Sequence, residues 1–264
     1  MKEVITSSKN SDIKYLRKLY NARKRRQEGK YILEGSRIIE QALDSGCSLT
    51  LVFATPDFDD PELLTRLQGD KLKIRYISRK LLESVADTVS PQGIIALAEK
   101  PDYYLSDVLS ESQESILVLD RIQDPGNMGT LIRTAAAAGV EGIVALKGCV
   151  DIYNLKVLRA TMGAVFSIPI ITRLGKNEFL QEVNEGDYFL VCTAIDGEQY
   201  YYEVEYGQPV VFVIGNEARG IDSDLLKVAN SRVKIPLSGE IDSLNAAVSG
   251  GIVLYDYLRQ KREH

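Results

Sequence analysis

The feature that most constrains this chain is a short β-branched run that stops at a glycine. Val210–Ile214 reads VVFVI, and Gly215 separates it from the polar segment NEARG. A continuous apolar run bounded by glycine is typical of a strand buried on both faces. Such strands belong to parallel sheets covered by helices. We therefore expect the loop after Ile214 at the carboxyl edge of an α/β sheet, where such folds bind ligands.

Similar apolar runs alternate with helical patterns through the last 150 residues or so. The predicted strands are 116–119, 143–146, 166–171, 189–194, 210–214 and 233–235. The predicted helices between and after them include 155–162, 178–183 and 243–262, the last with Ser243 as its N-cap. This alternation predicts an α/β fold with a largely parallel sheet.

The first hundred residues alternate in the same way and predict a smaller α/β domain. Its expected strands are 30–35, 49–54, 74–77 and 94–98, and its expected helices are 11–26, 36–43, 61–68 and 78–87. A polar, turn-rich stretch follows and is typical of a linker. The expected organisation is therefore a domain at 1–100, a linker at 101–115 and a second domain at 116–264.

Composition excludes several kinds of chemistry. The only histidine is His264, so a catalytic triad or a histidine metal site is not expected. The three cysteines, Cys47, Cys149 and Cys192, are isolated, which predicts reduced thiols and a cytoplasmic protein. The chain has no apolar run near 18 residues and a polar N-terminus, so neither a membrane span nor a signal peptide is expected. Dinucleotide-binding and P-loop glycine motifs are also missing.

Charge is divided unevenly along the chain. The net charge is −5, but residues 1–100 carry 18 basic and 14 acidic residues, and residues 9–37 carry ten basic and three. Such a segment is either a solvated surface or an RNA-binding one. The candidate RNA-binding residues are Lys14, Arg17, Lys18, Arg23, Lys24, Arg25, Arg26 and Arg37.

The segment after strand 116–119 places two polar side chains near a helix N-terminus. Asp124–Gly126 is predicted to form a turn, with Asn127 capping a helix that Gly139 ends. Arg133 lies in the second turn, where the helix dipole does not favour a cation. Two interpretations remain open for Arg133, an ion pair with a carboxylate or contact with an anion or partner chain.

Three stretches together resemble the SpoU family of RNA ribose 2′-O-methyltransferases in the trefoil-knotted SPOUT superfamily. They are LDRIQDPGNMGTLIRTAAAAGV at 119–140, VIGNEARGI at 213–221 and IPLSGEIDSLNAAVS at 235–249, and residues 153–164 also match the family. The first hundred residues resemble the ribosomal-protein-like RNA-binding domain that precedes the catalytic domain in many members. The resemblance implies a deep trefoil knot, S-adenosylmethionine as cofactor and a homodimer.

The resemblance also assigns residues to the site. The implied cofactor-binding residues are Thr193, Ala194, Gly215, Asn216, Glu217, Gly220, Ile235, Leu237, Leu244, Asn245 and Ala246. The implied catalytic residues are Asn127, Arg133, Glu217, Ser243 and Asn245. Arg133 would anchor a phosphate or stabilise the alkoxide, and Glu217 would act in catalysis or hold its own loop. No metal is implied, because the sulfonium methyl group is already activated.

The expected activity is methylation of a ribose 2′-hydroxyl in ribosomal RNA. Transfer RNA is an alternative substrate, and a non-catalytic RNA-binding protein of the same fold is an alternative function. The extra N-terminal domain favours ribosomal RNA. The full set of implied catalytic residues favours an enzyme.

Overall fold

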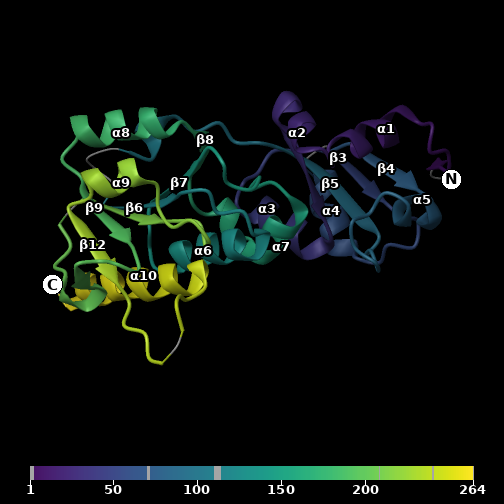
Figure 1. Cartoon of the computed structure of the whole chain (residues 1–264). Helices are drawn as coiled ribbons and strands as arrows, with labels where there is room; N and C mark the ends of the chain where they lie inside the picture. The colour runs from purple at the N-terminus through teal and green to yellow at the C-terminus, as the bar shows by residue number, and fades with distance from the viewer. Residues whose placement is uncertain (1–2, 70–71, 110–113, 208, 240, 264) are drawn as a thin grey trace. The chain divides into compact units, whose positions relative to one another are not determined.

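The computed structural model describes residues 3–69, 72–109, 114–207, 209–239 and 241–263. The chain forms two compact units (Figure 1). The first comprises Met1–Asp102 together with Tyr153–Phe166, and the second comprises Tyr103–Ile152 together with Ser167–His264. The segment Tyr153–Phe166, which follows the first predicted motif in sequence, thus packs with the N-terminal unit.

The second unit is built on a parallel sheet, in agreement with the prediction. Within the described residues it has seven strands in the order β10-β12-β9-β11-β6-β7-β8, and every paired neighbour runs parallel. The strands are β6 Ser115–Leu119, β7 Gly142–Leu146, β8 Ile170–Leu174, β9 Phe189–Thr193, β10 Gln199–Tyr200, β11 Val210–Ile214 and β12 Ser231–Lys234. The trefoil knot stays a prediction from the family resemblance.

Helices cover both faces of this sheet. They are α6 Pro125–Ala137, α8 Lys176–Glu185, α9 Ser223–Val228 and α10 Ala246–Glu263, with short 3-10 turns at Leu105–Asp107 and Tyr201–Glu203. In Figure 1, α8 and α9 lie on one side of the sheet and α6 and α10 on the other. Strand β11 serves both faces: Val211 and Val213 belong to the core beneath α8 and α9, whereas Phe212 meets Tyr257 of α10 at 5.4 Å between ring centroids.

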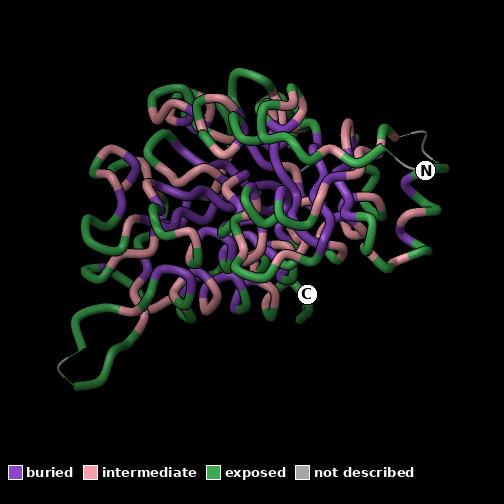
Figure 2. The backbone as a smooth tube through the Cα atoms, turned by 90° about the vertical axis from the view of Figure 1, so that its right-hand side faces the viewer, coloured by how far each residue is buried: buried purple, intermediate pink, exposed green. Residues whose placement is uncertain are grey.

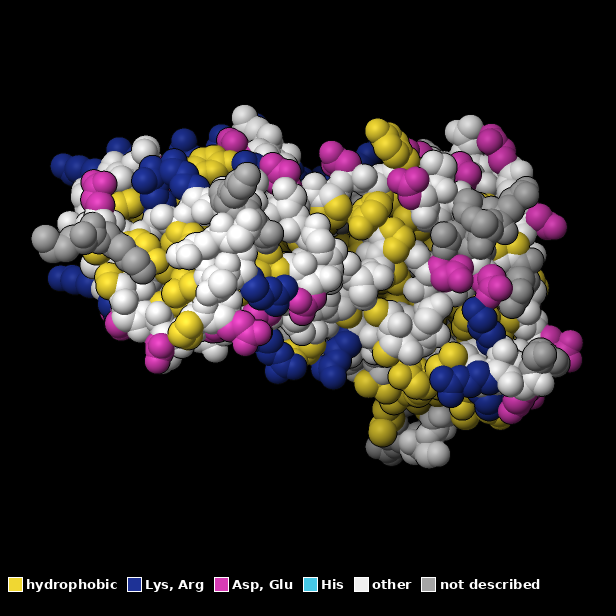
Figure 3. Space-filling model, turned by 180° about the vertical axis from the view of Figure 1, so that it is seen from behind, with side chains coloured by type: hydrophobic (Ala, Val, Ile, Leu, Met, Phe, Trp, Pro, Cys, Tyr) yellow, Lys and Arg dark blue, Asp and Glu magenta, His cyan; other side chains and the backbone are white. Residues whose placement is uncertain are grey.

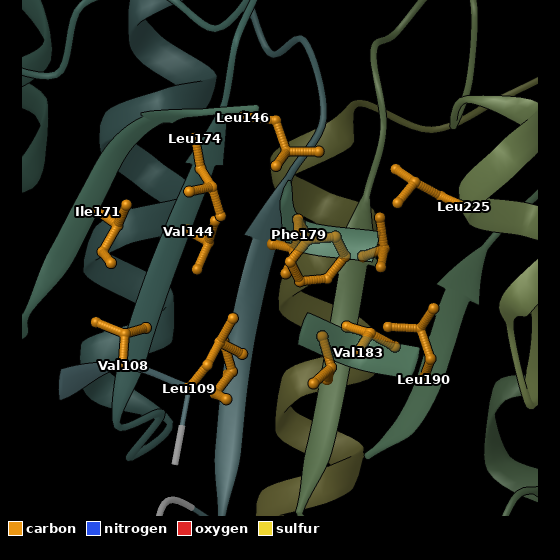
Figure 4. Packing of buried hydrophobic residues seen from close by; sticks show 14 of the residues in the cluster. Val108, Leu109, Val144, Leu146, Ile171, Leu174, Phe179, Val183, Leu190 and Leu225 are labelled. Atoms are coloured by element: carbon orange, nitrogen blue, oxygen red, sulfur yellow. The ribbon is translucent and has the colours of Figure 1, made fainter. Parts of the chain in front are cut away.

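The core under α8 and α9 is made of fully apolar side chains (Figure 4). Phe179 of α8 has no exposed surface and is surrounded by strand residues such as Val144 and Val211. Leu225 of α9 closes the same cluster. Figure 2 shows the buried residues in the interior of the tube. The β-branched runs identified in the sequence are core strands, because every residue of β6, β7 and β11 is buried.

The first unit has a mixed sheet with the order β1-β4-β3-β5-β2. Its strands are β1 Val4–Ile5, β2 Lys30–Glu34, β3 Leu49–Ala54, β4 Ile74–Ile77 and β5 Ile94–Glu99. Its helices are α1 Ser11–Lys18, α2 Ala22–Glu28, α3 Ser36–Asp44, α4 Pro61–Gly69, α5 Arg79–Glu83 and α7 Leu155–Thr161, with a 3-10 turn at Ala164–Phe166. Leu155 of α7 is part of this unit's core, together with residues such as Ile32 and Leu97.

Several predicted elements have other bounds in the structure, such as the helix expected at 78–87, which ends at Glu83, and two of the differences have a clear cause. The single helix expected at 11–26 is two helices, because Asn21 accepts hydrogen bonds from the backbone N–H groups of Arg23 and Lys24 and so starts α2 afresh. The strand expected at 166–171 begins at Ile170, since Phe166 lies in a 3-10 turn and Pro169 precedes the strand. None of the described helices is long and apolar enough to span a membrane.

We predict that Phe179→Ala lowers the free energy of unfolding of the second unit by about 3–5 kcal/mol, because it leaves a cavity in a fully buried cluster. Leu180→Ala on the same helix is the matched control, since Leu180 is only partly buried and should cost clearly less. Urea denaturation followed by circular dichroism measures both. Equal losses would contradict the description of this core.

Candidate functional site

A cavity of about 370 Å³ opens at the carboxyl ends of β9, β11 and β12. Such a volume is within the range of small-molecule sites. Three segments form most of its wall, namely 193–196 after β9, 214–221 after β11 and 233–249 around the start of α10. Ten of the eleven predicted cofactor-binding residues line it: Thr193, Ala194, Gly215, Asn216, Glu217, Gly220, Ile235, Leu237, Leu244 and Ala246.

The loop after β11 turns back sharply on itself. A Cβ atom at Gly215 would lie 2.5 Å from the backbone carbon of Gly220, so only glycine fits there. The backbone groups of Asn216 and Gly220 bond to each other in both directions, at 3.2 and 2.9 Å. Asn216 Oδ1 also accepts from the N–H groups of Ala218 and Arg219, each at 3.0 Å. The loop is therefore closed by its own hydrogen bonds, and all of its residues from Gly215 to Ile221 line the cavity.

Three polar side chains from distant parts of the sequence form one network. Asn127 Nδ2 donates to Glu217 Oε1 in a short hydrogen bond. Asn245 Nδ2 donates to Asn127 Oδ1 at 2.8 Å. Asn127 thus joins the loop after β11 to the segment that precedes α10. Asn245 is the one predicted cofactor-binding residue that does not line the cavity, although it bonds to this network.

Two helix starts differ from the prediction, and both differences explain this network. Asp124 rather than Asn127 caps α6, because its side chain accepts from the Asn127 N–H at 2.8 Å. The Asn127 side chain is then free to bond elsewhere. Helix α10 begins at Ala246 rather than at Ser243, and Asn245 Oδ1 accepts from the N–H groups of Ala247 and Val248. Ser243 instead lines the cavity.

Arg133 is exposed on α6 and does not line the cavity. Its guanidinium makes no hydrogen bond or ion pair with any residue that the structure describes. The carboxylate ion pair that the sequence left open is therefore not formed within the described chain. The guanidinium is accessible to an anion.

Sequence reasoning missed part of the site. Nine cavity-lining residues had not been predicted, and most of them adjoin predicted ones: Ile195, Asp196, Ile214, Ala218, Arg219, Ile221, Leu226, Val233 and Ser249. Sequence reasoning also missed Asp120 and Arg121, which contact the loop after β11. Their position directly after the buried run 116–119 was the available signal, because residues there face the same sheet edge.

The cysteines and acidic residues offer no alternative chemistry. Burial raises the pKa of Cys149 to about 11 and that of Cys192 to about 12, so neither side chain is a thiolate nucleophile at neutral pH. Among residues with described placement, no group of three or more His, Cys, Asp or Glu side chains is arranged to hold a metal.

Comparison with known proteins identifies the family. Residues 114–255 match the SpoU rRNA Methylase family, and residues 10–96 match the MRM3-like substrate binding domain. The chain belongs to the SpoU rRNA methylase family. It is 30% identical over 254 residues to the 23S rRNA (guanosine(2553)-2′-O)-methyltransferase RlmP of Bacillus subtilis, covering 95% of this chain and 97% of that protein. It is 32% identical to the human mitochondrial rRNA methyltransferase 3, covering 90% of this chain and 69% of that protein.

Solved structures agree with this assignment. The AdoMet-bound rRNA methyltransferase from Sinorhizobium meliloti superposes with a TM-score of 0.87 at 30% identity, over 97% of each chain. The SpoU methyltransferase AviRb from Streptomyces viridochromogenes, in complex with AdoMet, also gives 0.87 at 25% identity, over 96% of this chain and 99% of that one. The likeness to these solved structures therefore extends over both units of the chain.

The basic residues of this SpoU methylase are not all accessible. Lys14, Arg17 and Lys18 on α1, Arg23 and Arg26 on α2, and Arg37 on α3 are exposed, and Lys24 is half-buried. Arg25 differs, because it is 8% exposed and its Nη1 donates to the carbonyls of Leu19 and Tyr20, both at 2.9 Å. Arg25 therefore holds the α1–α2 connection. Lys and Arg side chains are numerous on the first unit in Figure 3, where they form dark blue patches.

We predict that Gly215→Ala destabilises this SpoU methylase by about 1–3 kcal/mol, because the added methyl group meets rigid backbone. Gly251→Ala in α10 is the control. The nearest atom to a Cβ there is a Thr134 methyl at 3.6 Å, so that change should be neutral or stabilise by up to about 1 kcal/mol. Chemical denaturation measures both, and a neutral Gly215→Ala would contradict the tight loop.

Proposed function

We propose that this protein is an S-adenosylmethionine-dependent RNA methyltransferase that acts on a ribose 2′-hydroxyl in ribosomal RNA. The observation that carries the proposal is the hydrogen-bond network of Asn127, Glu217 and Asn245, which lies beside a cavity at the carboxyl edge of the sheet. Family membership and the names of the relatives support the reaction. The match of residues 10–96 to a substrate-binding domain of mitochondrial rRNA methyltransferase type supports ribosomal RNA over transfer RNA.

The cavity fits the cofactor chemically. Gly215 and Gly220 let the backbone approach a ligand closely, so main-chain groups can bond to adenine and ribose. Ile235, Leu237 and Leu244 supply an apolar wall for the base. When bound, S-adenosylmethionine supplies a methyl group already activated by the sulfonium charge. The protein then has to position the two reactants and help the 2′-hydroxyl lose its proton.

The roles of the polar residues follow from their surroundings. Glu217 is exposed and hydrogen-bonded to Asn127, so its carboxylate both fixes the loop and faces the approach of a ribose. Asn127 orients Glu217, and Asn245 orients Asn127. Ser243 lines the cavity as a further hydrogen-bonding group for the ribose. A guanidinium keeps its proton in nearly every protein site, so Arg133 anchors an RNA phosphate or stabilises the alkoxide rather than accepting a proton.

Assembly and location are part of the same proposal. Val248 and Tyr255 are each 51% exposed on α10, and large apolar side chains on one helix suit contact with a second copy. A homodimer would place that helix, and Arg133 on its neighbour α6, at a subunit boundary. The reduced thiols favour the cytoplasm. The trefoil knot implied by family membership belongs to the proposal too.

Transfer of a tritiated methyl group from S-adenosylmethionine tests the function. Ribosomal and transfer RNA are supplied separately, and nuclease digestion then shows which nucleoside is labelled. Label in a 2′-O-methylated nucleoside of ribosomal RNA is expected. Label confined to transfer RNA would replace the substrate. Cofactor binding without transfer to naked or particle-bound RNA would favour a non-catalytic RNA-binding protein.

We predict that Arg133→Ala lowers the rate of methyl transfer by about 100-fold or more while leaving cofactor affinity nearly unchanged, because Arg133 does not line the cavity. Arg173→Ala, which removes another exposed arginine of the same unit, should leave the rate unchanged. Single-turnover kinetics and calorimetry give the two quantities. Equal losses of rate and of cofactor affinity in Arg133→Ala would rule out the assigned role.

We predict that neutralising Arg23, Lys24 and Arg26 to glutamine weakens RNA binding and flattens its dependence on salt. Each lost phosphate contact should reduce the slope of log K against log salt by about 0.7–0.9. Arg25 stays unchanged because it is structural. Filter binding across a salt series measures the slope, with Arg173→Gln as a single-charge control. An unchanged slope would place the RNA surface elsewhere.

A further inference from the structure

Asp120 and Arg121, which directly follow β6, contact the loop after β11 at three points. The backbone carbonyl of Arg121 accepts a hydrogen bond from Asn216 Nδ2 at 3.0 Å. The side chain of Arg121 donates from Nη2 to the carbonyl of Gly220 at 3.3 Å. Asp120 Oδ2 accepts from the backbone N–H of Asp222 at 2.8 Å. Together the two residues therefore contact the loop at its start (Asn216), near its end (Gly220) and just before α9 (Asp222).

The Arg121 side chain is fixed by Asp120 and packs beside Gly148. Its Nε and Nη2 donate to the two carboxylate oxygens of Asp120 at 2.9 and 2.8 Å, and the Asp120 side chain is only 4% exposed. A bidentate pair of this kind fixes the orientation of both groups. Gly148 leaves room for the arginine stem, because a Cβ there would lie 2.9 Å from Arg121 Cγ.

The backbone at Arg121 is held in a conformation that residues other than glycine seldom adopt. Its φ is +58°, in the left-handed region. Such a conformation persists where surrounding contacts fix it. Arg173 offers a direct comparison: its φ is +63°, yet it is exposed and its guanidinium has no partner among the described residues. Among the non-glycine residues that the structure describes, Arg121 alone combines this backbone geometry with contacts to residues of the cavity wall.

We propose that Asp120 and Arg121 are positioning residues that fix the loop 215–221 against the cavity and thereby set the affinity for S-adenosylmethionine. The inference rests on the proposed function for the identity of the ligand. Neither residue lines the cavity, so both act through Asn216, Gly220 and Asp222. Without the two side chains, the loop keeps the contact between Glu217 and Asn127 and the ion pair of Lys176 with Asp222 at its exit, but it loses the bonds that hold Gly220 and the backbone of Asp222.

The decisive variant is Arg121→Gly, because glycine adopts the left-handed backbone readily and the change removes the whole side chain with its guanidinium. Arg173→Gly is the matched control, since it makes the same change at an arginine with positive φ whose guanidinium has no partner among the described residues. Hydrogen–deuterium exchange of the peptide covering 213–224 is measured in cofactor-free protein. Calorimetry then gives the Kd for S-adenosylmethionine. Thermal unfolding checks that each variant is folded.

In Arg121→Gly we expect exchange at the loop amides to quicken and the Kd to rise by about tenfold, the effect of losing hydrogen bonds to a charged group. Arg173→Gly should change neither. Asp120→Asn, which removes the charge at similar shape, should give the same pattern, and Arg121→Lys should restore part of the affinity. These variants should raise KM for the cofactor far more than they lower kcat.

Wild-type exchange and affinity in Arg121→Gly would overturn the proposal. So would an equal effect of Arg173→Gly, which would assign the change to backbone freedom alone. The exchange measurement does not depend on the ligand. If the wild-type protein binds no S-adenosylmethionine, the proposed function fails, whereas faster loop exchange in Arg121→Gly but not in Arg173→Gly still supports the positioning of the loop by the pair.

Discussion

The tight turn of the backbone from Gly215 to Gly220 is the constraint on which the rest of the site depends. Strand β11 is buried along its whole length. Where the backbone leaves this strand at the sheet edge, its N–H and C=O groups must still find hydrogen-bond partners. The turn solves this by bonding Asn216 to Gly220 and by capping two further N–H groups with the Asn216 side chain. A loop satisfied in this way can present its backbone to a ligand, which a disordered connection could not do.

The strands were predictable because burial on both faces leaves a local trace in the sequence. Val210–Ile214 was predicted to the residue, since both faces of this strand pack against helices and all five positions are apolar. The same rule failed at 166–171, where Phe166 and Ile168 are apolar but precede the strand rather than belong to it. At Asn21 a single capping side chain divided a continuous helical pattern into two helices. The spacing of apolar residues indicates which positions are buried. It does not indicate where a capping side chain ends one helix and starts the next.

The site could be predicted only in part, and from motifs rather than from periodicity. The resemblance assigned eleven of the twenty residues that line the cavity. It did not show how those residues meet, because the bond from Asn127 to Glu217 spans 90 positions and that from Asn245 to Asn127 spans 118. Asp120 and Arg121 were missed for the same reason, since their contacts with the loop cross about a hundred residues. Contacts at such separation leave no local pattern.

The loop is held from two sides by different kinds of contact, and this separates its two tasks. On the β6 side, the buried Asp120 and the partly exposed Arg121 bond to backbone groups of Gly220 and Asp222. On the α6 side, Asn127 fixes the Glu217 carboxylate, which stays exposed. A polar group held in place before a reaction begins needs no reorganisation during it. One set of residues therefore contacts the backbone of the loop, while another orients the exposed Glu217 carboxylate.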